Sequence, residues 1–465
     1  MKKLRIPGVS APQTHSSELV SSARPSLVTV KQKAAVQIDQ VRGAGDRGVD
    51  LEFADDDVLE LELEGGLRLW MSFQQFQADF PSVKMAARAG AAAAGAAPVP
   101  ELFPVDLATA DAASRGLGTA LLRAVRVLVV GARDGNLPQL TAMAIAEAID
   151  NHLPERPVLF RCSPAQPLAA RVASPADLPT DRPVLIFIHG TASSTVGSFG
   201  GLWEPAQSQV KDELFKSYGA HVYAFEHRTL AESPVQNALQ LLKFLPKNAR
   251  LHLVSHSRGG LVGELLGLGQ RTSARNFDPF SATNLEYFFP GPPTDADPNL
   301  TDAEKLDRSA DRKALTRLAQ ELREKQPAVE RFVRVACPAR GTTLASGRLD
   351  LWLSTIVNVL SLAGLKANPA YAMALDLVLA VARERTNPHT LPGLEAQMPL
   401  SALVCFLNNP AFTVAADLTV IAGGAAGEGL WGRLKMLLPN LFYGEDHDLI
   451  VNTSAMYGGA ARHCH

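Results

Sequence analysis

The chain has 465 residues, of which 46% are hydrophobic and 20% are charged, so it can bury a large core and form more than one domain. Its 45 basic and 47 acidic residues leave a net charge of −2, which provides no bulk basic field for nucleic acid or an anionic membrane. No stretch offers about 20 uninterrupted apolar residues, so no integral membrane segment is expected.

The termini and cysteines favour a cytoplasmic protein. The first ten residues carry charge but no apolar segment behind it, so neither a signal peptide nor an anchor is predicted. The cysteines are scattered without metal-ligand or CxxC spacing, so reduced thiols, no metal and no cofactor are expected. They are Cys162, Cys337, Cys405 and Cys464.

The first third of the chain divides into a flexible N-terminus, residues 1–48, and an accessory region, residues 49–175. Residues 57–71 alternate apolar and polar side chains around two glycines, which predicts a β-hairpin with one wet face. The Ala- and Gly-rich residues 85–98 are expected to form a linker or a weak helix. Residues 117–153 have helical spacing, although 125–130 could be a strand.

From residue 183 onward, strand and helix patterns alternate, which is typical of an α/β protein with a mostly parallel sheet. A helix should begin after the N-cap Ser233, and another should span Arg258–Leu268. Right-handed crossovers then put the ends of the strands on one edge of the sheet. The strand candidates are Val184–His189, His221–Phe225, Leu251–Ser255, Phe332–Ala336 and Leu418–Ala422.

Ser257 is the candidate nucleophile because an apolar strand runs directly into it and a helix follows at once. A tight turn of this kind lifts a serine oxygen above the sheet, beside backbone N–H groups that can receive negative charge. Only small neighbours fit. Ser255 and Gly259 satisfy this requirement, although the usual G-x-S-x-G pattern has glycine in place of Ser255.

An upstream strand ends in a His-Gly pair at His189, as the loop of an oxyanion hole does. One donor would be the backbone N–H of Thr191 or Ala192, and we select Thr191. The second would be the N–H of Arg258. His189 is expected to brace the loop and not to act as the base.

With both motifs in place, the chain resembles the α/β-hydrolase superfamily and its lipase-like branch. The resemblance rests on Phe187–Ser194, Val254–Gly260 and Val335–Thr343, and covers roughly residues 180–460. It implies an α/β-hydrolase fold for residues 176–465 and serine esterase chemistry. The chain is also similar to hydrolase-like modules of large bacterial proteins, which implies contact with another protein domain.

Two insertions, at about residues 271–328 and 347–400, interrupt the expected core. A helix is predicted for Ala303–Lys325 in the first, and the second reads as mainly helical. Helices at these positions could form a lid or an acyl-binding cap over the active-site edge. Alternatively, they enlarge the core or contact another domain.

The acid and base are sought after the nucleophile, because the chain order in this fold is Ser, acid, His. Asp448 occupies the place of the acid in lipase-like relatives, with Asp446 as second choice, although either could cap a turn. The residues after Asp448 show no apolar alternation of strand length and form a short terminus that is usually frayed. The chain could therefore be truncated, with the base lost or supplied elsewhere. Within it, His463 is preferred over His465.

Other histidines are poorer candidates for the base. His256 should pack or hydrogen-bond beneath the turn at Ser257. His447 precedes Asp448, so it does not match the expected order of Ser, acid and His. The remaining three lie on or beside strands and are expected to be satisfied core residues: His221, His227 and His252.

The resulting hypothesis is a serine hydrolase of the lipase or esterase type, which cleaves a carboxylic ester or lipid substrate through an acyl-enzyme. Its machinery would be Ser257, Asp448 and His463, with Thr191 and Arg258 as oxyanion donors. The alternative is a non-catalytic or incomplete module that serves as a scaffold or recognition domain. The missing final strand favours that alternative, whereas the turn at Ser257 and the loop that begins at His189 favour an enzyme.

Overall fold

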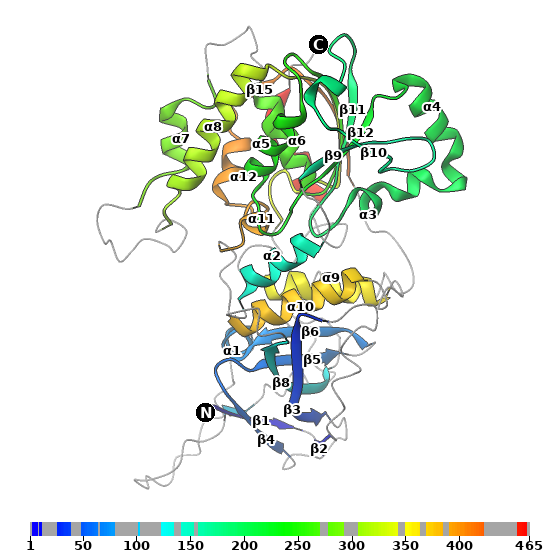
Figure 1. Cartoon of the computed structure of the whole chain (residues 1–465). Coiled ribbons are helices and arrows are strands. Elements are labelled where there is room, and N and C mark those ends of the chain that lie inside the picture. Colours follow the sequence, from blue (N-terminus) through cyan, green and yellow to red (C-terminus); the bar gives the residue numbers. More distant parts are fainter. Residues whose placement is uncertain are drawn as a thin grey trace. The chain divides into compact units, whose positions relative to one another are not determined.

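The computed structural model divides the chain into two compact units (Figure 1). The first comprises Met1–Ile145, Arg348–Asn387 and Ala426–Gly444, and the second comprises the rest. Within the described ranges, no helix is long and apolar enough to cross a membrane. The structure describes residues 2–7, 9–11, 26–38, 48–63, 66–79, 101–102, 122–133, 141–152, 157–269, 278–292, 306–342, 349–362, 369–384, 390–422 and 453–462.

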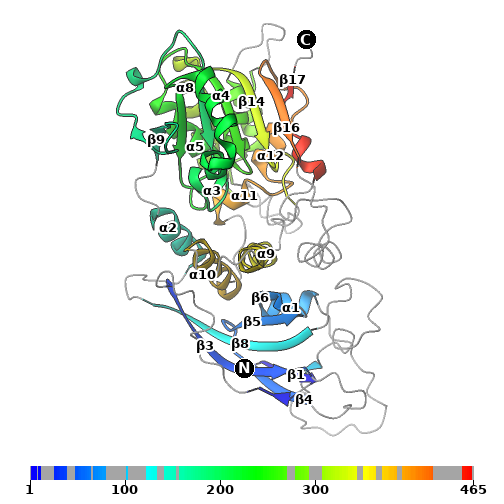
Figure 2. The same ribbon diagram turned by 90° about the vertical axis from the view of Figure 1, so that its right-hand side faces the viewer.

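A five-stranded sheet in which all neighbours are antiparallel forms the centre of the first unit (Figure 2). The predicted hairpin is confirmed, because β5 and β6 pair from Val58 with Ser72 to Glu62 with Arg68. In order across the sheet, the strands are β2 (Val9–Ser10), β3 (Val28–Gln37), β8 (Leu122–Ala132), β5 (Val58–Leu63) and β6 (Arg68–Ser72).

A second sheet of this unit has the order β4 (Gly48–Phe53), β1 (Lys2–Pro7) and β7 (Glu101–Leu102). The prediction of a flexible N-terminus was wrong for the described part of residues 1–48, because β1, β2 and β3 lie there. Residues 125–130 belong to β8, so the alternative prediction of a strand there, rather than a helix, is confirmed. The helix α2 (Ala142–His152) begins only later. The expected linker at residues 85–98 lies outside the described residues.

The hairpin has no wet face at its centre. Glu60 of β5 is fully buried, and it accepts hydrogen bonds from Trp70 Nε1 at 2.9 Å and Arg126 Nη1 at 2.6 Å. A buried carboxylate is tolerated when it is paired in this way. The alternation of the sequence therefore marked the strand correctly but not its exposure.

Helices α9 (Leu349–Leu362) and α10 (Pro369–Glu384) pack against this sheet, as does α1 (Phe73–Asp79). Asn358 of α9 accepts from the N–H of Arg68 at 2.9 Å and donates to its carbonyl at 2.6 Å. Because β6 is an edge strand, α9 satisfies backbone groups that would otherwise be unpaired. Much of the second insertion thus belongs to the first unit, although the sequence analysis placed it within the hydrolase domain, and its role as a lid stays a prediction.

The second unit is built on a seven-stranded mixed sheet. Four successive pairings, from β12 to β16, are parallel, whereas β9 and β10 lie antiparallel at one edge. All five predicted strands are present within a few residues, but β9 and β10 fall in the region predicted to be accessory. The order is β10 (Ala170–Arg171), β9 (Val158–Arg161), β12 (Val222–Glu226), β11 (Val184–Ile188), β13 (Arg250–His256), β14 (Ala328–Val335) and β16 (Asp417–Ile421).

Helices cover both faces of this sheet (Figure 1). Ser233 caps α5 with a capping box and Pro234 in the first turn, as the sequence predicts. One face carries α5 (Pro234–Phe244), α6 (Gly259–Leu268), α7 (Ala282–Phe288), α8 (Ser309–Lys325) and α12 (Ala402–Leu407), and the other carries α3 (Thr195–Phe199) and α4 (Ser208–Tyr218). Shorter helical segments are η4 (Pro175–Asp177), η5 (Gly200–Trp203), η6 (Pro205–Gln207), α11 (Pro392–Glu395) and η10 (Thr453–Tyr457).

The described part of the first insertion enlarges the core. Leu285 and Phe289, in and beside α7, and Leu318 of α8 are buried in the main hydrophobic cluster together with residues of α5 and α6. Phe406 of α12 packs its ring against Phe289. The alternative of added core therefore describes α7 and α8 better than a lid does.

The chain near its end is held by a buried ion pair. Arg334 of β14 and Glu264 of α6 are both fully buried, with Arg334 Nη1 2.6 Å from Glu264 Oε1. Arg334 Nη2 also donates to the carbonyls of Met456 and Gly458, at 2.8 and 2.5 Å. The strand β17 (Ala461–Arg462) then pairs in parallel with β15 (Thr413–Val414). The expectation of a frayed terminus was therefore wrong for residues 453–462.

Candidate functional site

Ser257 occupies a sharp turn between β13 and α6, with a φ of 50°. A left-handed backbone of this kind costs a non-glycine residue about 1–3 kcal/mol and persists only where its surroundings enforce it. Here the N–H of Ser257 donates to the carbonyl of Val335 at 2.8 Å, and its own carbonyl accepts from Gly260 at 3.0 Å. The half-buried Ser257 therefore has the backbone of a nucleophile elbow.

Two glycines let the elbow touch the loop after β11. A Cβ on Gly259 would lie 2.4 Å from the carbonyl oxygen of Ile188, and one on Gly190 would lie 2.8 Å from Ser257 Cβ. Neither distance leaves room for a side chain. Because β11 and β13 are parallel neighbours, Ser257 and Thr191 meet at the carboxyl edge of the sheet, as predicted.

The two predicted oxyanion donors are both available. Within the described part of the chain, neither the N–H of Thr191 nor that of Arg258 donates a hydrogen bond. The N–H of Ala192, the other alternative, is occupied, because it donates to Thr229 Oγ1 at 2.8 Å. Since backbone N–H groups away from water usually have a partner, two unpaired ones beside Ser257 can receive an anionic oxygen.

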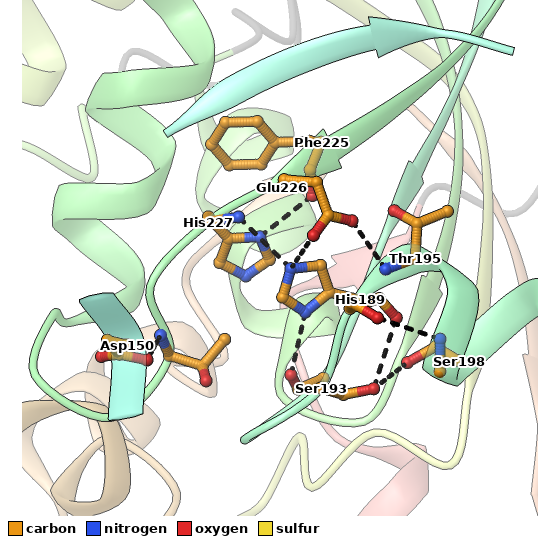
Figure 3. A network of polar contacts seen from close by, with 12 residues as sticks. Asp150, His189, Ser193, Thr195, Ser198, Phe225, Glu226 and His227 are labelled. Carbon is orange, nitrogen blue, oxygen red and sulfur yellow. Dashed lines mark hydrogen bonds and ion pairs between the residues drawn. The ribbon is translucent and has the colours of Figure 1, made fainter. Parts of the chain in front are cut away.

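A buried polar network holds the loop from behind (Figure 3). Glu226, at the end of β12, accepts from the N–H of Thr195 at 2.7 Å. The N–H of His227 donates to His189 Nε2 at 3.2 Å, while His189 Nδ1 faces the carbonyl of Gly190 at 3.0 Å. These contacts assign the proton of a neutral His189 to Nδ1. The ring thus braces the loop, as expected, and stacks on His227 with centroids 4.1 Å apart.

Asp150 of α2 supports the same loop indirectly. Its buried carboxylate accepts from three successive N–H groups, those of Thr229 and Leu230 at 3.1 Å and Ala231 at 2.8 Å. Thr229 in turn accepts from Ala192. The sequence analysis missed Asp150, because nothing in the pattern of a helix in the presumed accessory region shows which loop it will meet.

The side chain of Arg258 has a role that the sequence did not reveal. It is fully buried and donates to the carbonyl of Gly393 at 3.0 Å, to Asn237 Oδ1 at 2.9 Å and to the carbonyl of Glu232. Burial lowers the pKa of the guanidinium to about 10, so it stays protonated at neutral pH. Arg258 therefore ties the elbow to α5 and to the segment that contains α11. The sequence signal that could have indicated this role is a cation placed between Ser257 and two glycines.

The predicted acid and base are not tested by the structure. Ser257 Oγ has no hydrogen-bond partner among the residues that the structure describes. His256 is turned toward Ser198 Oγ, 3.3 Å from its Nδ1, in agreement with a supporting role. The remaining candidates lie outside the described residues: Asp446, His447, Asp448, His463 and His465.

The position of Arg462 bears on His463, its neighbour. Arg462 pairs with Val414, and Val414 lies against Gly267, near the end of α6 that is remote from Ser257. His463 itself lies outside the described residues.

The described ranges contain three free cysteines and no cluster of metal-ligating side chains. No group of three or more His, Cys, Asp or Glu side chains gathers there as it would around a metal ion. Cys162, Cys337 and Cys405 are free thiols, and burial raises the pKa of the first two to about 12. Such thiols remain protonated and poorly nucleophilic. Cys464 lies beyond the described residues.

Among solved structures, the chain is similar to bacterial lipases at low identity. The mature lipase BlEst2 of Bacillus licheniformis shares 13% identity over 61% of this chain and 85% of its own, with a TM-score of 0.28. The propeptide form of the same lipase shares 12% identity over 60% of this chain and 44% of its own, with a TM-score of 0.26. Lipase 1 of Pelosinus fermentans shares 14% identity over 48% of this chain and 64% of its own, with a TM-score of 0.26. TM-scores this low do not establish a common arrangement.

No curated protein matches the chain. A protein family described as a domain of unknown function, DUF7379, matches residues 160–279 and 310–464, which is more than half of the chain and includes the elbow and the loop after β11. The chain belongs to this family of proteins with a domain of unknown function, DUF7379.

Proposed function

We propose that the second unit is a serine hydrolase of the α/β-hydrolase type that cleaves carboxylic esters through an acyl-enzyme. The observation that carries the proposal is the left-handed turn at Ser257, at the end of β13, in contact with a loop whose Thr191 N–H is unpaired. Holding a serine in this backbone costs free energy that a merely structural turn would avoid with glycine.

In the proposed reaction, Ser257 Oγ attacks the ester carbonyl carbon while a base removes its proton. The carbonyl oxygen becomes an oxyanion and accepts hydrogen bonds from the N–H groups of Thr191 and Arg258. The proton passes to the leaving alcohol, which gives the acyl-enzyme, and water then releases the carboxylic acid. Asp448, or Asp446, would orient the base.

The base is proposed to be His463, with His465 as the alternative. A serine without a base remains a weak nucleophile, so this residue decides between an enzyme and an inactive module. The second candidate is a non-catalytic recognition or scaffold module, which is the function expected if no base reaches Ser257.

The test is labelling of the full chain with a serine-reactive fluorophosphonate and hydrolysis of p-nitrophenyl esters. Ser257→Ala should abolish both, whereas Ser208→Ala, at an exposed serine of α4, should keep both. Retained turnover in Ser257→Ala would sink the assignment. A folded wild-type chain that neither labels nor turns over ester would establish the non-catalytic module.

A second panel locates the acid and base. It comprises Asp446→Asn, Asp448→Asn, and alanine variants of His447, His463 and His465, all outside the described residues. Loss of labelling in one histidine variant, with an unchanged melting temperature, identifies the base. His463→Ala with wild-type labelling would rule out the proposed base while leaving Ser257 in place.

A further inference from the structure

A cavity of about 520 Å³ opens at the amino edge of the seven-stranded sheet, at the opposite ends of the strands from Ser257. Its lining comes from the starts of the parallel strands and from the end of α4. His252 and Arg331 are register partners on β13 and β14, and Arg182 immediately precedes β11. His252 lies five residues before Ser257 on the same strand, which corresponds to roughly 16 Å at 3.3 Å per residue.

The lining is cationic and contains no carboxylate: its charged members are Arg182, Lys216 and Arg331. Arg182 is paired with its neighbour Asp181 at 3.0 Å, and Lys216 lies 3.5 Å from Glu213. Arg331 makes no ion pair within the described ranges. The cavity therefore offers at least one guanidinium for an anionic ligand.

Two histidines supply polar groups beside these charges. His252 is engaged, with Nδ1 2.7 Å from Tyr218 Oη and Nε2 3.3 Å from Glu330 Oε2. His221 Nδ1, by contrast, is buried and has no partner among the described residues. Burial, and then the positive charges of Arg182 and Arg161, lower the pKa of His221, so the ring is neutral at pH 7 and can donate one N–H.

An apolar hollow of about 370 Å³ adjoins the cationic cavity, and Gly219 lines both. Its walls include Cys162, Ala169, Phe215 and Ala220. Gly219 is exposed, and a Cβ placed on it would meet nothing within 4 Å, so no atom crowds the rim that the two spaces share at this residue. A ligand could therefore place a charged group in one space and a hydrocarbon group in the other.

We propose that this double cavity binds an oxyanion joined to a hydrocarbon group, with the oxyanion at Arg331, Arg182 and His221 and the hydrocarbon against Phe215. An alkyl phosphate represents this class. The guanidinium groups match two oxygens of such a head group, and the apolar hollow contributes by excluding water from the chain. The site is separate from Ser257 and does not depend on the proposed function.

The experiment uses the full chain with 13C-labelled histidine, titrated with hexyl phosphate or inorganic phosphate and followed by NMR and calorimetry. The resonances of His221 and His252 are assigned from glutamine variants of each. Hexyl phosphate should bind at one site and shift these two resonances but not those of His189 and His227. It should bind about tenfold more tightly than inorganic phosphate, because the hydrocarbon is buried.

Arg331→Gln should weaken the binding of hexyl phosphate about tenfold, since a charge-assisted hydrogen bond is lost. Arg317→Gln, at an exposed position of α8, is the matched control and should leave the affinity unchanged. Unmoved resonances of His221 and His252, or equal affinities of the two variants, would overturn the site. Equal binding of phosphate and hexyl phosphate would overturn the role of the hollow.

Discussion

The two ends of β13 differ in how they are built. At the carboxyl end, the turn at Ser257 packs so closely on the loop after β11 that neither Gly259 nor Gly190 has room for a Cβ. At the amino end, a cavity of about 520 Å³ is lined by flexible side chains, including the exposed Arg331. Atoms that react must be held within a fraction of an ångström, whereas a ligand can be captured by side chains that adjust to it.

The largest effect is expected from Gly259→Ala. The added Cβ would lie 2.4 Å from the carbonyl oxygen of Ile188 and 2.6 Å from that of His189, and both are backbone atoms. We expect a loss of more than about 4 kcal/mol in the free energy of unfolding, and no fluorophosphonate labelling. Unfolding in urea measures the free energy of unfolding. The control is Gly201→Ala, which meets no atom within 4 Å. Equal stabilities of the two variants would contradict a rigid carboxyl edge.

The next largest effect is expected from Arg258→Met. It removes a buried cation and, among the described residues, leaves the carbonyl of Glu232 and Oδ1 of Asn237 without their donor. The expected loss of stability is about 3 kcal/mol, because hydrogen bonds to charged groups are worth more than neutral ones. Chemical denaturation tests this. Arg258→Lys retains the charge, so its free energy of unfolding should lie between those of the methionine variant and the wild type. A methionine variant as stable as the wild type would show that the guanidinium does not support the turn at Ser257.

Asp150→Ala tests the support behind the oxyanion loop. Three N–H groups, two of them buried, lose their acceptor, so we expect a loss of about 2 kcal/mol and slower labelling of Ser257. Asp150→Asn keeps one carbonyl oxygen and should be intermediate in both measurements. If alanine lowered the melting temperature without slowing the labelling, Asp150 would be structural only.

Thr229→Val probes the link between that support and the oxyanion loop. The variant keeps the shape of the side chain but removes the acceptor for the N–H of Ala192. We expect about tenfold slower labelling, with a loss of stability of only about 1 kcal/mol. Thr229→Ser restores the hydroxyl and should restore the rate. A valine variant that labels at the wild-type rate would break the proposed link.

The smallest effect is expected from Ser255→Ala. Ser255 is fully buried on β13, and its hydroxyl has no partner within the described residues. Removing it should leave the free energy of unfolding unchanged or raise it by up to about 1 kcal/mol. A clear loss in thermal unfolding would mean that the hydroxyl is satisfied, and that the carboxyl edge holds a further polar contact.

Local pattern predicted some elements and failed on others. The strands of the second unit were found because each is a continuous apolar run, and the hairpin of β5 and β6 because its turn lies between its own strands. The strands of residues 1–48 were missed because β3 pairs with β8, almost a hundred positions away, so its sequence neighbours carry no sign of the partner. The regrouping of Arg348–Asn387 with the first unit was missed for the same reason.

For this protein, the sequence alone determined where the sharp turn at Ser257 lies and which loop faces it, because a strand that passes through small residues directly into a helix favours this turn. Only the tertiary structure decided that the N–H of Ala192 donates to Thr229, that Asp150 supports the loop from a distant helix, that Arg258 ties the turn to distant segments, and that the amino edge carries a cationic cavity. These features depend on side chains that meet across the sheet, and the pairing of distant segments is set by the packing of the whole core rather than by local periodicity.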